Sequence, residues 1–117
     1  GEVYQCASTL AGAYEVTQKI MWERPATDGI IYVVDLLAAS GVRALVDLGF
    51  TVPEQVAVVG VDNSIYGEIS NPKLTSLDNK LLDLSTAAAE TLIAALQGRR
   101  VPKKVLIYSS IVERETT

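Results

Sequence analysis

The segment Val52–Asn63 (VPEQVAVVGVDN) decides the fold class. Pro53 opens a polar turn, and Val56–Val61 is a short apolar run rich in β-branched residues, which predicts a buried strand. Asp62 and Asn63 give the strand a polar end. A buried strand that ends in a carboxylate is typical of a sheet whose strand ends border a crevice.

A second run of the same kind lies upstream. Gly29–Val34 (GIIYVV) predicts a strand buried on both faces, as in a parallel sheet. The segment between the two runs predicts a helix over Leu36–Leu48 that Gly49 terminates. Before the first run, Ser8 or Thr9 can cap a helix that ends near Trp22, because Arg24 precedes a proline and avoids helical angles.

The chain after Asp62 continues the alternation. Asp62–Lys73 predicts a loop, Leu74–Leu77 an extended stretch, and Leu81–Leu96 a helix that Gly98 ends. A basic turn, Arg99–Lys104, precedes two strand candidates, Val105–Tyr108 and Ser110–Val112. Helices that alternate with strands in this way predict an α/β layered fold with parallel strands.

Composition limits the function. The 117 residues suffice for one domain, and the net charge of −4 repels phosphate backbones, so direct contact with nucleic acid is disfavoured. The chain has no membrane-length apolar stretch and shows no secretory signal at its start. It has no histidine and only Cys6, which fits a reducing compartment or a small apolar filler. No metal site, cofactor motif or glycine-rich phosphate loop is predicted, and only carboxylate chemistry remains for catalysis.

Two carboxylates occupy informative positions. Asp35 and Asp62 each directly follow a predicted buried strand, so they would face one crevice if the strands are neighbours. Carboxylates there suit polyhydroxy or amine-bearing ligands. Asp35 has an alternative role as the N-cap of the next helix, and Asp62 could instead cap a turn in its own loop. A pair of acids could also act as general acid and base, although no second signature supports an enzyme.

Several motifs resemble the lac-repressor (LacI/GalR) family of bacterial transcription regulators. Leu45–Asn63 (LVDLGFTVPEQVAVVGVDN) is similar to the family's leucine–glycine helix end followed by VPEDVSVVGFDD or a close variant. Asn71–Leu96 resembles the family's PPLTTIRQP segment and the alanine-rich helix after it. Val105–Thr117 resembles the closing strand with its LVxRxST ending, and Ala26–Leu45 resembles PDAIFCANDLMALGALRAL. The motifs share order and spacing and cover nearly the whole chain.

The resemblance implies a domain organisation. Residues 1–117 would form the C-terminal half of a periplasmic-binding-protein-like sensor domain, with residues 78–98 crossing over to pack on an N-terminal subdomain that this chain lacks. The DNA-binding headpiece would also lie outside the chain. The family further implies a small-molecule effector, a sugar or related metabolite, bound in the cleft between the subdomains. No enzymatic activity, cofactor or metal is expected, because the chain has no histidine, a single cysteine and no cofactor motif.

The resemblance also implies site residues, one position at a time. Asp62 and Asn63 match the GFDD acids, and Asp35 matches the aspartate of the AND motif, with Val34 and Leu36 on either side of it. Ala7 and Leu81 align near positions that can be aromatic in the family. These side chains are smaller or more apolar than the family's, which disfavours a typical monosaccharide effector. The effector site would thus comprise Asp62, Asn63, Asp35, Val34, Leu36, Ala7 and Leu81.

The family also dimerises through this subdomain. The matching surface would lie on the helix Leu36–Leu48 and the loop that follows Asn63, with Leu37, Ser40, Ala44, Leu48, Ile65 and Tyr66 at a homodimer interface. Operator DNA would be bound only through the absent headpiece, in the cytoplasm and without contact to a membrane. The alternative is a periplasmic sugar-binding protein of a transport system, which shares the fold.

Overall fold

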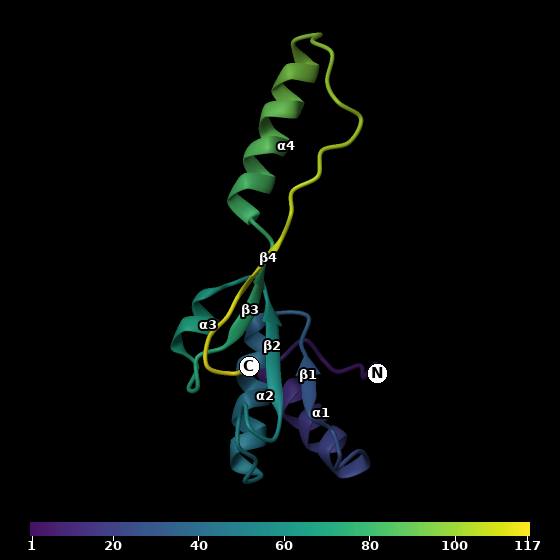
Figure 1. Cartoon of the computed structure of the whole chain (residues 1–117). Coiled ribbons are helices and arrows are strands. Elements are labelled where there is room, and N and C mark those ends of the chain that lie inside the picture. The colour runs from purple at the N-terminus through teal and green to yellow at the C-terminus, as the bar shows by residue number, and fades with distance from the viewer.

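The computed structural model describes residues 1–117, whose strands form one four-stranded sheet in the order β1-β2-β3-β4 (Figure 1). The strands β1 (Gly29–Ile31), β2 (Ala57–Val61) and β3 (Thr75–Asp78) are parallel, and β4 (Ser110–Val112) is antiparallel to β3. The predicted α/β fold with parallel strands is therefore confirmed, with an antiparallel strand at one edge. We call residues 1–78 and 110–117 the body.

Two helices bury one face of the sheet. In α1 (Leu10–Glu23), Thr9 caps the first turn by accepting a hydrogen bond from Gly12 N at 3.0 Å, as predicted. The helix packs on α2 (Asp35–Asp47). The core that they share with the sheet comprises Ala13, Ile20, Met21, Tyr32, Leu37, Ala38, Val42, Leu45, Val56, Val58 and Leu74.

The opposite face of the sheet is bare at its β1 edge. Tyr32 is buried, but Ile31 and Val33 expose 77% and 75% of their surface. The prediction that Gly29–Val34 is buried on both faces is therefore wrong for this chain. The physical reason is that α1 and α2 lie on one side only, so side chains that alternate along the segment point to the core and to solvent in turn.

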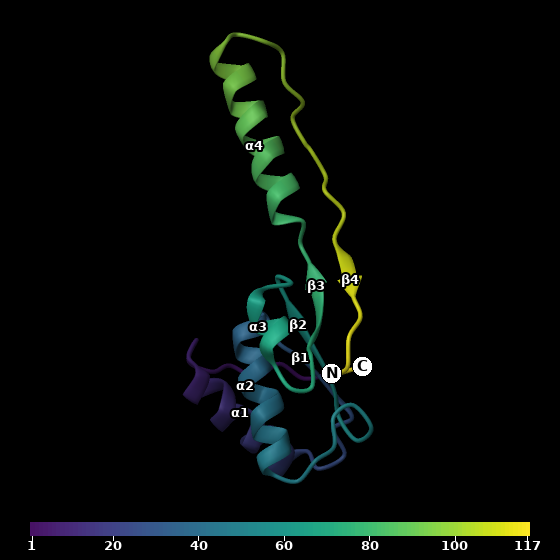
Figure 2. The same cartoon turned by 90° about the vertical axis from the view of Figure 1, so that its left-hand side faces the viewer.

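The helix α4 (Leu81–Leu96) stands away from the body (Figures 1 and 2). It has no buried residue, and the molecule is accordingly elongated, with extents of 59 × 25 × 23 Å. We call residues 79–109 the arm. Gly98, with φ +72°, follows the helix as predicted. The strand candidate Val105–Tyr108 is wrong, because the returning chain pairs with no strand until β4.

The predicted loop after β2 contains a short helix, α3 (Ile65–Ile69), that lies beside α2. Five residues are too few to show a helical period in the sequence. The loop places the exposed side chains of Ile65, Tyr66 and Ile69 on the surface of the body. None of the helices has the length and apolar character needed to cross a bilayer.

Candidate functional site

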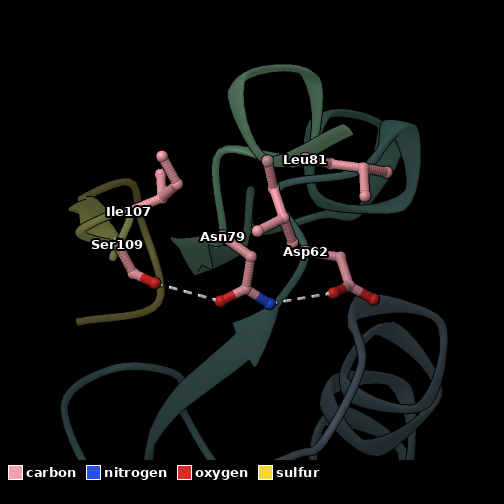
Figure 3. A pocket seen from close by; sticks show the side chains of 6 residues that line it. Asp62, Asn79, Leu81, Ile107 and Ser109 are labelled. Carbon is pink, nitrogen blue, oxygen red and sulfur yellow. Dashed lines mark hydrogen bonds between the residues drawn. The ribbon is translucent and has the colours of Figure 1, made fainter. Parts of the chain in front are cut away.

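A pocket of about 320 Å³ lies where the arm leaves the body (Figure 3). Because β3 ends at Asp78 and the arm begins one residue later, the carboxyl ends of the three parallel strands face this junction. The lining residues come from both parts: Asp62, Asn79, Leu81, Leu84, Ile107 and Ser109. The crevice predicted from the strand ends is therefore present at Asp62.

A chain of polar side chains crosses the pocket floor. The amide Nδ2 of Asn79 donates to Asp62 Oδ1 at 3.3 Å, and Ser109 Oγ donates to Asn79 Oδ1 at 3.2 Å (Figure 3). Asp62 is exposed, so its second carboxylate oxygen can accept hydrogen bonds from a ligand hydroxyl. Leucine and isoleucine side chains supply the apolar wall. A few convergent polar groups beside apolar surface are typical of a small-molecule site.

The backbone after β2 has an unusual conformation that fixes the place of Asp62. Asp62 and Asn63 have φ values of +99° and +48°, in the region that L-residues seldom adopt. Backbone hydrogen bonds hold both residues: Asp62 N donates to Leu77 O at 2.9 Å, and Asn63 N donates to Ser76 Oγ at 3.0 Å. The carboxylate of Asp62 is thus held at the pocket by β3.

The junction has a second local support. Lys80, with φ +54°, precedes α4 and donates twice to Asp78, from N to Oδ1 at 2.7 Å and from Nζ to Oδ2 at 2.8 Å. The side-chain hydrogen bond from Lys80 is the main cause that lowers the pKa of Asp78 below its ordinary value. The carboxylate therefore stays ionised and keeps the left-handed turn into α4 in place.

Asp35 lies beneath this site and not in it. It is 1% exposed, and its Oδ2 accepts hydrogen bonds from Ser64 N at 2.6 Å and Ser64 Oγ at 3.0 Å. Its Oδ1 accepts from Ser76 Oγ at 2.5 Å. The N-cap prediction is wrong, because Val34 precedes α2 and Asp35 lies in the first turn without a capping bond. Asp35 instead joins the start of α2 to the loop after β2 and to β3.

Arg114 is a functional candidate that the sequence reasoning missed. Its side chain is 11% exposed. Nη1 donates to Leu74 O at 2.8 Å, and Nη2 donates to Asn63 Oδ1 at 2.7 Å and to Glu68 Oε1 at 2.5 Å. The available signal was its place in the VERETT ending, where it matches the arginine of the family's LVxRxST pattern, and a charged side chain that is largely buried needs partners.

The remaining candidates for the effector site are dispersed. Leu81 lines the pocket, whereas Val34 and Leu36 are half-buried and Ala7 is exposed, and none of these three is among its lining residues. Four lining residues were not predicted: Asn79, Leu84, Ile107 and Ser109. They belong to the arm, which the sequence does not place beside Asp62. No group of three or more acidic, cysteine or histidine side chains could hold a metal ion.

The candidates for a dimer interface divide by burial. Leu37 and Ala44 are 4% and 0% exposed. The prediction that these two residues lie at a dimer interface is therefore wrong, because the α1 side of α2 is already covered within this chain. Ser40 is half-buried and donates from Oγ to Leu10 O at 2.6 Å. Leu48, Ile65 and Tyr66 expose 42%, 64% and 41% of their surface and are free to meet a partner.

Comparison with known proteins identifies the family. The profile of the periplasmic binding protein-like domain matches residues 2–117. The chain belongs to this family. A periplasmic binding protein-like chain of the LacI type was predicted from the motifs, and the relatives confirm that resemblance.

Three matches illustrate the relationship. The chain is 30% identical over 112 residues to an HTH-type transcriptional regulator of Lachnoclostridium phytofermentans, covering 96% of this chain and 34% of that protein. A LacI family transcriptional regulator from Arthrobacter sp. FB24, solved in complex with lactose, superposes with a TM-score of 0.87 at 34% identity, covering 96% and 42% of the two chains. A regulator from Bifidobacterium animalis subsp. lactis, at 22% identity and a TM-score of 0.94 over 99% and 43% of the chains, supports the fold alone.

The periplasmic binding protein-like chain spans about a third of the length of the curated relatives that it matches. These relatives are transcriptional regulators and a ribose operon repressor. The coverage means that two thirds of each relative has no counterpart in the 117 residues.

Proposed function

We propose that this chain is the C-terminal part of the effector-sensing domain of a LacI-type transcription regulator, and that its effector is a sugar or related metabolite. The observation that carries the proposal is Asp62, which follows the VVGV strand, lines the pocket and keeps one carboxylate oxygen free of protein partners. The lactose complex of a 34% identical regulator supports a sugar as ligand. Asn79 and Ser109 add an amide and a hydroxyl from the arm.

The exposed arm supports the second part of the proposal, that it packs on an N-terminal subdomain. Leu81, Leu82 and Leu96 expose 72%, 78% and 79% of their surface. Helices with such apolar surface are buried in complete domains. In the full-length regulator the missing subdomain would cover the arm and form the opposite wall of the pocket.

A homodimer is the third part of the proposal. Leu48, just after α2, and Ile65, Tyr66 and Ile69 on α3 are apolar side chains exposed on the body. Such a surface favours an isologous contact between two copies. We expect Ser40 to lie at the margin of the dimer interface. We also expect a DNA-binding headpiece outside this chain to contact operator DNA in the cytoplasm. Effector binding would then shift the equilibrium between arrangements of the two headpieces.

The test compares the full-length regulator with its Asp62→Asn variant by titration calorimetry against lactose, cellobiose and a set of monosaccharides. Loss of a hydrogen bond to a charged group costs about 1.5–3 kcal/mol, so the bound sugar should lose affinity by about 10-fold to 100-fold. Glu113→Gln, which removes one charge outside the pocket, should bind as the wild type does.

Two results would contradict the proposal. Equal affinity of Asp62→Asn and the wild type would remove Asp62 from the site, and a wild-type protein that binds none of the sugars would exclude a sugar effector. The sequence ahead of the chain provides a further test, since a regulator has a headpiece within about the first 60 residues. A signal peptide there would favour the transport protein instead.

A further inference from the structure

Arg114 joins three segments that are far apart in the sequence. One guanidinium contacts Leu74 O before β3, the side-chain amide of Asn63 after β2, and the carboxylate of Glu68 in α3. The same nitrogen, Nη2, donates to both Asn63 and Glu68. The planar fork of arginine can serve several acceptors in fixed directions, whereas a lysine ammonium on a flexible stem cannot hold the same set.

One end of this cluster is the pocket. Asn63 directly follows Asp62, and both residues have positive φ. The backbone of Asn63 is tied to Ser76, which in turn donates to Asp35, and its side chain is tied to Arg114. If Asp62 moves, few neighbouring contacts can adjust to the movement. One of them is the hydrogen bond between the side-chain amide of Asn63 and the guanidinium of Arg114.

The other end is the exposed apolar surface of α3. Glu68 lies between Tyr66 and Ile69, and its side chain is 52% exposed. A lone surface ion pair contributes little, but the Arg114 side chain is 11% exposed, and its guanidinium donates to three acceptors. Its position therefore depends on Asn63 and Glu68 together.

We propose that Arg114 is a positioning residue that couples the Asp62 wall of the pocket to α3. This inference rests on the proposed function, in which Asp62 contacts the effector and α3 meets a second copy. Ligand contact at Asp62 would be transmitted through Asn63 and Arg114 to Glu68, and so to the apolar side chains on either side of it.

The test requires no ligand. In the ¹⁵N-labelled 117-residue chain, Glu68→Gln should shift the amide resonances of Asp62 and Asn63 as well as those of α3. In an Arg114→Lys background the charge remains but the fork is lost, so the shift at Asn63 should fall by about threefold or more, while the shifts within α3 persist. Glu113→Gln is the control, because it removes a neighbouring charge and should leave Asn63 unmoved.

Equal shifts at Asn63 in both backgrounds, or no shift there in the wild type, would overturn the coupling. If Arg114→Lys does not fold, Asn63→Gly tests the same coupling from the pocket side. Glycine tolerates the positive φ at this position but removes the acceptor for Arg114, so the amide resonance of Glu68 should shift. An unmoved Glu68 amide would also overturn it. Because no sugar is used, these outcomes are independent of whether the proposed effector binds.

Discussion

Gly60, the fourth residue of β2, provides the most direct test of the network beneath the pocket. A Cβ at this position would lie 2.3 Å from Asp35 Oδ1, 2.8 Å from Leu74 Cδ2 and 3.2 Å from Asp35 Cα. The carboxylate therefore cannot keep its position in Gly60→Ala, and its hydrogen bond from Ser76 must lengthen or break. The space that the glycine leaves is the space that Asp35 occupies.

The magnitude follows from three terms. Overpacking a buried site costs about 1–3 kcal/mol. A weakened hydrogen bond to a buried charge costs about 1.5–3 kcal/mol, and part of this overlaps with the overpacking. Replacing glycine stabilises the folded state by about 0.4–1 kcal/mol through the unfolded chain. We expect Gly60→Ala to lower the free energy of unfolding by about 2–4 kcal/mol.

Gly29→Ala is the matched control, because it also replaces a strand glycine. Its Cβ would meet nothing closer than Ala57 O at 3.8 Å, which is ordinary contact. We expect its free energy of unfolding to change by less than about 0.5 kcal/mol. Urea unfolding followed by circular dichroism measures both variants. If Gly60→Ala loses no more stability than Gly29→Ala, the reasoning that Asp35 is tightly held is refuted.

Two further predictions test the body and the arm. Leu45 is fully buried, so Leu45→Ala should cost about 2–5 kcal/mol in urea unfolding, whereas Leu82→Ala, at a site 78% exposed, should cost less than about 0.5 kcal/mol; similar losses would mean that the arm packs on the body. The hydrogen bond from Arg43 lowers the pKa of Asp47 in the folded chain below its ordinary value of 3.8. The ionised Asp47 therefore stabilises the folded chain above pH 3.8, and this stabilisation is lost as the pH falls through the pKa that Asp47 has in the folded chain. A carboxyl NMR titration should show this low pKa, with Arg43→Gln moving it back up; a wild-type pKa at or above 3.8 would contradict the assignment.

The local patterns of the sequence predict most of the elements. The β-branched run before Asp62 becomes β2, and Thr9 caps α1 as its side chain and position indicate. Such features depend on residues within one turn or one strand, so they can be identified from sequence. The exposure of one face of β1 could not be predicted from the sequence, because an apolar run shows only that a segment can be buried and not what covers it.

The contacts of the site depend on residues distant in sequence. Asp35 precedes a helix and so suggests a cap, but its partners Ser64 and Ser76 lie 29 and 41 residues away. Arg114 likewise meets Asn63 across 51 residues. Only the sheet order brings these side chains together, since β3 lies between β2 and β4. Local propensity contains no information on such pairs, which explains why both residues were misjudged or missed.

The position of the pocket has a mechanical consequence. The chain passes between body and arm twice, after β3 and before β4, and the pocket takes Asn79 and Ser109 from these two crossings. Asp62 belongs to the body and is hydrogen-bonded to Asn79 across the junction. A ligand that bonds to Asp62 and to the arm residues together would therefore favour one angle between the two parts. A ligand that contacts Asp62 alone has no differential affinity for such angles and would bind without shifting them.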